Sequence, residues 1–224
     1  MELLKYMKNQ RILVVSPHLD DETLGVGGTI LKHNSEGDYV YWINVTLPED
    51  QVKRKRRISE QKRISTFFKI KEFFQMPFIS TELEGKNKQL VSSFTNLFIQ
   101  IKPNVLYLPN RSDIHSDHRY IFDAAYSCTK SFRYPFINRV LMYETLSETE
   151  FAPSLIDKVF HPNVFNDISK FFDKKVEALK IYHEELMDTR APRSLKAVKS
   201  QAHLRGSRIG CAYAEAFMLI FEKH

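Results

Sequence analysis

The sequence predicts an α/β fold in which a mostly parallel β-sheet is covered by helices on both faces. Two observations lead to this fold class. Short apolar runs alternate with longer amphipathic stretches along most of the 224 residues, and the breaks between them are short. Strands that alternate with helices pair in parallel, because each helix carries the chain back across the sheet. The length suits one domain, so we expect a single domain over residues 1–224.

Six runs rich in β-branched and aromatic residues predict the strands. They cover residues 11–16, 39–46, 71–75, 105–108, 139–143 and 211–221. The first contains four consecutive apolar residues, Ile12 to Val15, which is typical of a strand buried on both faces. Pro17 ends this strand, because proline has a fixed φ and no N–H to donate.

Apolar residues at helical spacing predict the helices between these strands. The helices cover residues 26–35, 50–68, 90–101, 117–130, 168–186 and 194–204. Gly37 stops the first helix, and Pro103 breaks the chain after the third. The third has the clearest pattern, since Phe94, Phe98 and Ile101 recur on one face. The last third of the chain is less regular.

The composition argues against several classes of protein. No apolar run approaches the roughly 20 residues needed to span a bilayer, and the start, Met1 to Lys5, lacks the apolar core of a secretory signal. With only Cys128 and Cys211, a disulfide framework is not expected. We therefore expect a cytoplasmic protein. Its net charge of +6 favours anionic substrates without requiring them.

Ionisable side chains follow the first predicted strand directly. An imidazole and three carboxylates, from His18, Asp20, Asp21 and Glu22, occur within five residues. Such groups are costly to bury unless something pairs them, and a divalent metal would do so. His18 and Asp21 are three residues apart, so one turn can direct both to a common point. Asp20 would then point elsewhere and remain free to hold a proton.

A second cluster, residues 111–118, follows the predicted strand 105–108 in the same way. In open parallel sheets, ligands bind outside the carboxyl ends of the strands, so the two clusters can converge there. A metal held by His18, Asp21 and His118 would have two nitrogens, one oxygen and an open position. This donor set is the pattern of a catalytic zinc.

The remaining side chains of the two clusters suit amide hydrolysis. Zinc lowers the pKa of a bound water to about 7 and polarises a carbonyl. Asp20 is the natural general base for that metal-bound water. His115, with Asp117 as a candidate orienting partner, would stabilise an oxyanion or protonate a leaving amine. The clusters therefore predict a metal-dependent amide hydrolase.

Each motif also has a simpler interpretation. A His-x-x-His pair often decorates a helix surface, and Asp-Asp-Glu after a strand often marks only a helix N-terminus. Residues 25–28 contain three glycines but lack the Gly-x-Gly-x-x-Gly spacing of a dinucleotide site. The basic run 53–57 is either a solvated helix face or a surface that attracts a phosphorylated substrate. Nucleic acid is a weaker option, since no recognised binding module accompanies the run.

Several segments resemble the PIG-L/LmbE-like zinc deacetylase family. Residues 17–25, Pro-His-Leu-Asp-Asp-Glu-Thr-Leu-Gly, followed by Gly-Gly-Thr-Ile at 27–30, resemble its first signature. Residues 113–118, Asp-Ile-His-Ser-Asp-His, resemble its Asp-x-His-Pro-Asp-His motif. Parts of 182–217 are similar to the C-terminal region of many members, and residues 57–60 fit its Arg-x-x-Glu.

The resemblance implies a Rossmann-like fold and hydrolysis of the N-acetyl group of an N-acetylglucosamine-type sugar conjugate. It implies His18, Asp21 and His118 as ligands of zinc, or of another divalent metal such as Fe²⁺. It also implies Asp20 as the base and His115, oriented by Asp117, as the electrostatic or acid partner.

Three residues are candidates for contacting the substrate. Arg57 belongs to the Arg-x-x-Glu match, whereas Tyr143 and Glu144 stand at the carboxyl end of a predicted strand and either line a sugar pocket or pack in the core. Leu47-Pro48-Glu49-Asp50 departs from the Thr-x-Gly-Glu common in the family, which favours an unusual sugar acceptor.

The predicted partner is a small N-acetylated sugar conjugate. It would be phosphorylated if the basic run 53–57 attracts the substrate. A homo-oligomer is compatible with the sequence. Two alternatives remain open. One is an amidase acting on a larger thiol- or glycoside-linked amide. The other is a non-enzymatic module that binds an anionic glycan or nucleic acid through residues 53–63. Retention of Asp20 favours an enzyme, because binding alone needs no base.

Overall fold

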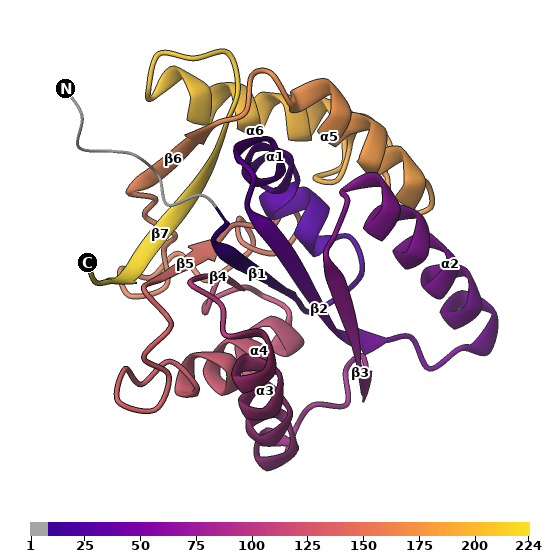
Figure 1. Ribbon diagram of the computed structural model, residues 1–224. Coiled ribbons are helices and arrows are strands. Elements are labelled where there is room, and N and C mark those ends of the chain that lie inside the picture. The colour runs from indigo at the N-terminus through magenta and orange to yellow at the C-terminus, as the bar shows by residue number, and fades with distance from the viewer. Residues whose placement is uncertain (1–8) are drawn as a thin grey trace.

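A computed structural model describes residues 9–224 and shows one seven-stranded sheet with helices on both faces (Figure 1). The strand order is β3-β2-β1-β4-β5-β7-β6. The first five strands of this order pair in parallel, whereas β7 runs antiparallel to both β5 and β6. The predicted α/β class, a mostly parallel sheet covered on both sides, is confirmed.

The elements follow one another in regular alternation through the first two thirds of the chain. These are β1 (Arg11–Ser16), α1 (Asp21–Glu36), β2 (Tyr39–Leu47), α2 (Gln51–Phe67), β3 (Glu72–Ile79), α3 (Asn87–Ile101), β4 (Val105–Pro109), α4 (Ser116–Ser127) and β5 (Arg139–Tyr143). The last third contains β6 (Val164–Asp167), α5 (Phe172–Leu179), a 3₁₀ turn (Lys180–Tyr182), α6 (Leu195–Ser207) and β7 (Ala214–Glu222).

The alternation of side chains along each strand divides the core in two. Leu13 and Val15 of β1 face the layer formed by α3 and α4, where Phe94 and Phe98 are fully buried. Residues of opposite parity, such as Ile12, pack against α1, α2 and the 3₁₀ turn. A third apolar cluster joins α1 to α5 and α6. Helices therefore cover both faces of the sheet, and the edge at the carboxyl ends of the parallel strands remains available for a functional site.

Several element boundaries differ from the sequence predictions, and three of the differences are the largest or bear on the site. Helix α1 begins at Asp21 rather than at 26, because the glycines of its first turns remain helical and let other elements approach closely. A Cβ at Gly28 would lie only 2.7 Å from Ile168 Cδ1. Strand β3 is longer than the predicted 71–75. The predicted helix 168–186 is shorter and ends in the 3₁₀ turn.

Strand β6 was missing from the prediction. It has only four residues, and it is stabilised by antiparallel pairing with β7, as in the pair Phe165 and Ala216. No helix in the described part of the chain has the length and apolar character to cross a membrane. The expectation about a secretory signal concerns residues 1–5, which lie outside the described residues.

Candidate active site

The site lies where the strand order reverses. Strand β1 pairs with β2 on one side and with β4 on the other, so the loops after β1 and β4 leave the same edge of the sheet in different directions. Such a switch point is the usual ligand site of an open α/β sheet. The loop after β1 carries His18 and Asp20, and Asp21 is the first residue of α1. The loop after β4 carries His115, with His118 in the first turn of α4.

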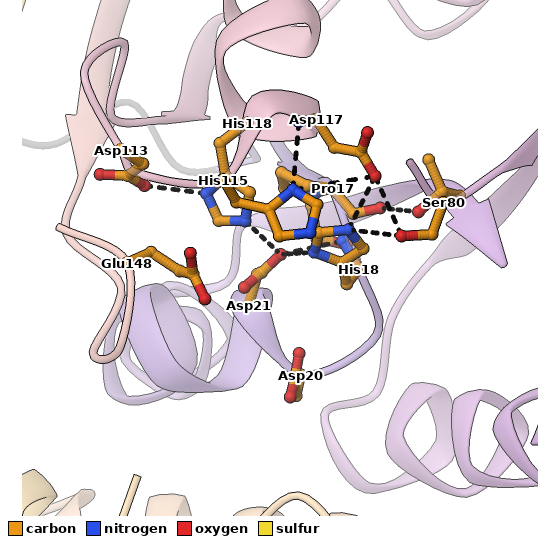
Figure 2. A network of polar contacts seen from close by, with 12 residues as sticks. Pro17, His18, Asp20, Asp21, Ser80, Asp113, His115, Asp117, His118 and Glu148 are labelled. Carbon is orange, nitrogen blue, oxygen red and sulfur yellow. Dashed lines mark hydrogen bonds and ion pairs between the residues drawn. The ribbon is translucent and has the colours of Figure 1, made fainter. Parts of the chain in front are cut away.

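The structure brings the three predicted metal ligands together (Figure 2). Oδ2 of Asp21 lies 3.4 Å from Nδ1 of His18 and 3.3 Å from Nε2 of His118. One donor atom from each residue lies within 4.8 Å of the other two. Asp21 and His118 are buried, and the His18 side chain is 21% exposed, so the cluster opens to solvent on the His18 side.

Outer carboxylates decide which nitrogen of each ring faces Asp21. Oδ2 of Asp113 lies 2.8 Å from Nδ1 of His118, and Oδ2 of Asp117 lies 3.0 Å from Nε2 of His18. In the neutral rings, the nitrogens bonded to these carboxylates carry the hydrogen. The lone pairs of the other two nitrogens then point at Asp21. Three lone-pair donors thus converge with no hydrogen between them.

This arrangement fits a bound cation. Nε2 of His118 is buried and has no hydrogen-bond partner among the described residues, which is costly for a polar atom. Two imidazole nitrogens and one carboxylate oxygen suit zinc or another divalent metal with an open position. His18, Asp21 and His118 would hold the metal.

The electrostatics of the cluster point the same way. Burial opposes protonation of His18, but its bonds to Asp117 and Asp21 outweigh burial and raise the pKa of His18 to about 9. For His118, burial is outweighed by Asp21 and Asp113, and its pKa also rises. The pKa of Asp21 lies well below its usual value, because the two imidazoles outweigh burial. Without a metal, the carboxylates of Asp21, Asp113 and Asp117 therefore stabilise protons on the two imidazole rings.

The Asp20 side chain lies apart from the three candidate metal ligands (Figure 2). This is the position expected if Asp21 binds the metal and Asp20 remains free to hold a proton. The Asp20 backbone has φ 128°, a left-handed value rare outside glycine, and such strain is concentrated at functional sites. Burial and the adjacent Asp21 raise the pKa of Asp20 to about 7, against the opposing effect of Arg57 and Arg193. A carboxylate with this pKa can accept a proton at neutral pH and return it.

His115 forms the N-cap of α4 and is held by the backbone. Its Nδ1 accepts a hydrogen bond from the Asp117 N–H at 3.1 Å, which leaves the proton of the neutral ring on Nε2. Burial and the nearby His18 lower the pKa of His115 to about 4. Asp117 was expected to orient His115, and the contact between them is this backbone N–H; the Asp117 carboxylate lies 4.0 Å from His115 and bonds to His18 and Ser80.

A cavity of about 280 Å³ opens beside the cluster. Helix α2 contributes Lys53, Arg56 and Arg57 to its wall, and the end of β2 and the loop after it contribute Leu47 and Pro48. The remaining lining residues are His18, Leu19, Asp20, Asp21, Thr46, Ser80, His115, Glu148, Glu185 and Arg193. The cavity therefore brings candidate metal ligands, Asp20 and His115 next to a basic wall formed by α2.

The three residues predicted to contact substrate lie in different places. Arg57 lines the cavity, where it makes ion pairs with Glu60 and Glu185. Tyr143 is fully buried under α1 and donates its hydroxyl to the Val15 carbonyl. Neither it nor Glu144 is among the residues that line the cavity.

Glu144 is turned away towards α6. Its two carboxylate oxygens accept hydrogen bonds from Arg205 at 2.8 and 2.6 Å. The alternative interpretation, that Tyr143 packs in the core, matches its position, whereas Glu144 forms an ion pair with Arg205. We therefore do not include either residue in the proposed substrate contacts.

Several side chains at the site were not predicted. Ser80 follows β3, Glu148 follows β5, and Glu185 and Arg193 belong to the segment between the 3₁₀ turn and α6. Ser80 and Glu148 are remote in sequence from both motifs and carry no spacing signal. Glu185 and Arg193 lie in the C-terminal segments that resemble the family, but the resemblance gave them no role. In the C-terminal region that resembles the family, Tyr182 donates a hydrogen bond to the buried Glu22, and the side chain of His183 is 69% exposed.

Together, the fold and the site define a Rossmann-like α/β protein with a cluster of two histidines and one aspartate at its switch point. Residues 13–129 match the family model described as PIG-L, GlcNAc-PI de-N-acetylase. The chain belongs to this PIG-L family.

Similar proteins cover nearly the whole chain. A diacetylchitobiose deacetylase from Thermococcus kodakarensis is 22% identical, with 94% of this chain and 83% of the relative aligned. The crystal structure of the conserved protein TT1542 from Thermus thermophilus matches with a TM-score of 0.78 at 23% identity, covering 95% of this chain and 96% of that one.

A third similar protein is a different kind of enzyme. GalB, the 4-carboxy-2-hydroxymuconate hydratase from Pseudomonas putida, matches with a TM-score of 0.72 at 16% identity, covering 96% of this chain and 98% of that one. At this identity the likeness concerns the fold alone. The reaction must therefore be argued from the site.

Proposed function

We propose that this protein is a zinc-dependent N-deacetylase that removes the acetyl group from an N-acetylglucosamine-type sugar conjugate. The observation that carries the proposal is the buried, unpartnered Nε2 of His118, directed with His18 Nδ1 at the same oxygen of Asp21. Membership of the PIG-L family and the likeness to a diacetylchitobiose deacetylase support the choice of reaction.

The described residues can carry the proton through amide hydrolysis. A divalent metal at this site would lower the pKa of a bound water and polarise the amide carbonyl. Asp20 takes a proton from the attacking water as the new C–O bond forms. His115 donates its Nε2–H to the carbonyl oxygen as negative charge develops there. Asp20 then returns its proton to the nitrogen as the C–N bond breaks, which gives acetic acid and the free amine, and these ionise at neutral pH to acetate and an ammonium group.

The basic wall favours an acceptor with a negative charge, such as a sugar nucleotide or another phosphorylated conjugate. Lys53 is exposed, lines the cavity and has no ion-pair partner among residues 9–224. Arg56 lines the same wall but pairs with Glu184. A positive charge so near the start of α2 works against the helix dipole, which is a cost that substrate binding would offset. A neutral glycoside or a larger amide would not use Lys53.

The compartment is part of the same proposal. Cys128 and Cys211 are both free thiols. Free thiols fit the reducing cytoplasm, where we propose that the enzyme acts.

The proposal is tested by acetate release. Purified protein would be treated with a chelator, reloaded with zinc or Fe²⁺, and incubated with N-acetylglucosamine, N,N'-diacetylchitobiose and UDP-N-acetylglucosamine. We expect acetate from at least one sugar, loss of release with chelator, and recovery with metal. A metal-loaded protein that releases acetate from none of them, yet hydrates an unsaturated carboxylic acid, would contradict the assignment and indicate a hydratase.

A further inference from the structure

We propose that Arg193 is a positioning residue that holds the general base, Asp20, in the orientation needed for proton transfer. This inference rests on the proposed function. Arg193 lies 173 residues from Asp20 in the sequence, yet its Nη1 donates to Asp20 Oδ2 at 3.1 Å. It thereby links the C-terminal third of the chain to the loop after β1.

Arg193 is one member of a closed ring of four charges. Nη1 of Arg193 lies 3.1 Å from Asp20 and 3.5 Å from Glu185. Nη2 of Arg57 lies 3.2 Å from Glu185 and 3.7 Å from Asp20. Each acid thus touches both arginines. Three parts of the fold meet in this ring: the start of α1, helix α2, and the segment 183–194.

The ring acts on one oxygen of the base. Both guanidinium groups approach Oδ2 of Asp20, whereas Oδ1 accepts no hydrogen bond from the described residues. A carboxylate held by one oxygen presents the other in a fixed direction, and orientation of this kind is a large part of catalysis. The strained φ of 128° at Asp20 also needs such support.

The segment that carries Arg193 is itself anchored. The backbone carbonyl of Arg193 accepts a hydrogen bond from the Met187 N–H at 3.2 Å. The next residue, Ser194, caps α6, because its hydroxyl oxygen accepts a hydrogen bond from the Ala197 N–H at 3.1 Å. The guanidinium is therefore held at a fixed distance from Asp20 rather than extended on a free loop.

A direct role in substrate binding is the competing explanation, since Arg193 also lines the cavity. The two explanations differ in what happens when the base is absent. A residue that acts through Asp20 has nothing left to position in an Asp20→Asn enzyme. A residue that binds substrate keeps its effect in that enzyme.

The kinetic test uses Arg193→Ala, Arg193→Lys and Asp20→Asn, alone and combined, with N,N'-diacetylchitobiose as the probe. We expect Arg193→Ala to lower kcat by about 10- to 100-fold, with KM and metal content within about twofold of wild type. Arg193→Lys should recover part of the loss. In the Asp20→Asn background, Arg193→Ala should change kcat by less than about twofold.

Arg190→Ala is the matched control, because Arg190 is exposed in the same segment and makes no ion pair with any described residue. It should leave kcat unchanged. A raised KM with normal kcat in Arg193→Ala, or an undiminished loss in the Asp20→Asn background, would overturn the positioning role.

Crystal structures of the zinc-loaded wild type and Arg193→Ala give a readout independent of activity. We expect the Asp20 carboxylate to rotate or shift in the variant while His18, Asp21 and His118 stay in place. An unmoved Asp20 would overturn the inference. If the wild type releases no acetate, the proposed function fails, and these structures still decide whether Arg193 positions Asp20. Arg193→Lys serves the same comparison if the alanine variant does not fold.

Discussion

Oδ2 of Asp117 lies 3.0 Å from Nε2 of His18, on the opposite side of the ring from Asp21. The same carboxylate accepts hydrogen bonds from Ser80 Oγ and the Thr81 N–H. Its position is therefore fixed before any metal binds. If His18 binds the metal as proposed, Asp117 should raise the metal affinity, because it would orient the His18 ring and increase the basicity of the nitrogen that faces the metal.

Asp117→Asn should weaken metal binding by about 10- to 100-fold while leaving the three ligands in place. Competition of the protein with a chromogenic zinc chelator measures this affinity. Asp123→Asn is the matched control, since Asp123 is an exposed acid on the same helix. Equal affinities for the Asp117→Asn variant and the control would show that the outer carboxylate does not tune the site.

Asp20→Asn keeps the size of the side chain but removes its basicity. Because general-base catalysis contributes about 10²- to 10⁴-fold, kcat should fall within that range while metal content stays normal. A base must be deprotonated to act, so wild-type kcat/KM should rise with pH through the pKa of Asp20, which a bound divalent cation would hold below its metal-free value of about 7. The variant should lack this limb. An Asp20→Asn enzyme with near wild-type kcat and a full metal complement would rule Asp20 out as the base.

The stability of the metal-free protein should fall as pH rises above about 6.5, where His115, whose pKa is lowered from 6.5 to about 4, no longer contributes with the opposite sign. Asp20 and Glu22 have pKa values raised from 3.8 and 4.5 to about 7, and His18 from 6.5 to about 9. Each group binds more protons in the folded than in the unfolded chain between its two pKa values. The stabilisation is therefore present at low pH and lost as pH rises from about 4 to 9.

Thermal unfolding of the chelator-treated protein between about pH 6.5 and 9 tests whether its stability falls as pH rises. Zinc-loaded protein is the comparison, because metal binding displaces protons and should flatten or reverse the slope. A metal-free Tm that rises across the same range would contradict the protonation scheme of the cluster.

Lys53→Gln should raise KM for a phosphorylated acceptor such as UDP-N-acetylglucosamine by roughly twofold to tenfold at low ionic strength. The effect should shrink as salt screens the charge, and it should be smaller for uncharged N,N'-diacetylchitobiose. Lys55→Gln is the control, because Lys55 is exposed on α2 but does not line the cavity. If Lys53→Gln and Lys55→Gln behave alike with both sugars, the basic run is only a solvated helix face.

The metal-binding arrangement could be predicted because its parts are local. His18 and Asp21 lie within one turn, and His118 lies in a second motif that follows a neighbouring strand. Apolar runs in the sequence predicted β1 and β4, and parallel pairing places the carboxyl ends of these two strands side by side. The same reasoning gave the α/β class from the alternation of strands and helices.

The outer parts of the site could not be predicted, because they depend on side-chain direction and on loops remote in sequence. Asp117 is next to His118, yet its carboxylate contacts His18 rather than His115. Tyr143 stands at the carboxyl end of β5, but strand parity turns its ring inwards beneath Gly25. Arg193 reaches Asp20 only through the course of the C-terminal segment.

The measurement that tests the central claim most directly is metal content determined together with acetate release on the same preparations. The account predicts about one metal per chain in the wild type, and loss of both metal and activity in His18→Ala, Asp21→Ala and His118→Ala. His161→Ala, a change at an exposed histidine outside the cluster, should retain both. Full metal occupancy in the Asp21 or His118 variant, or undiminished acetate release without metal, would contradict it.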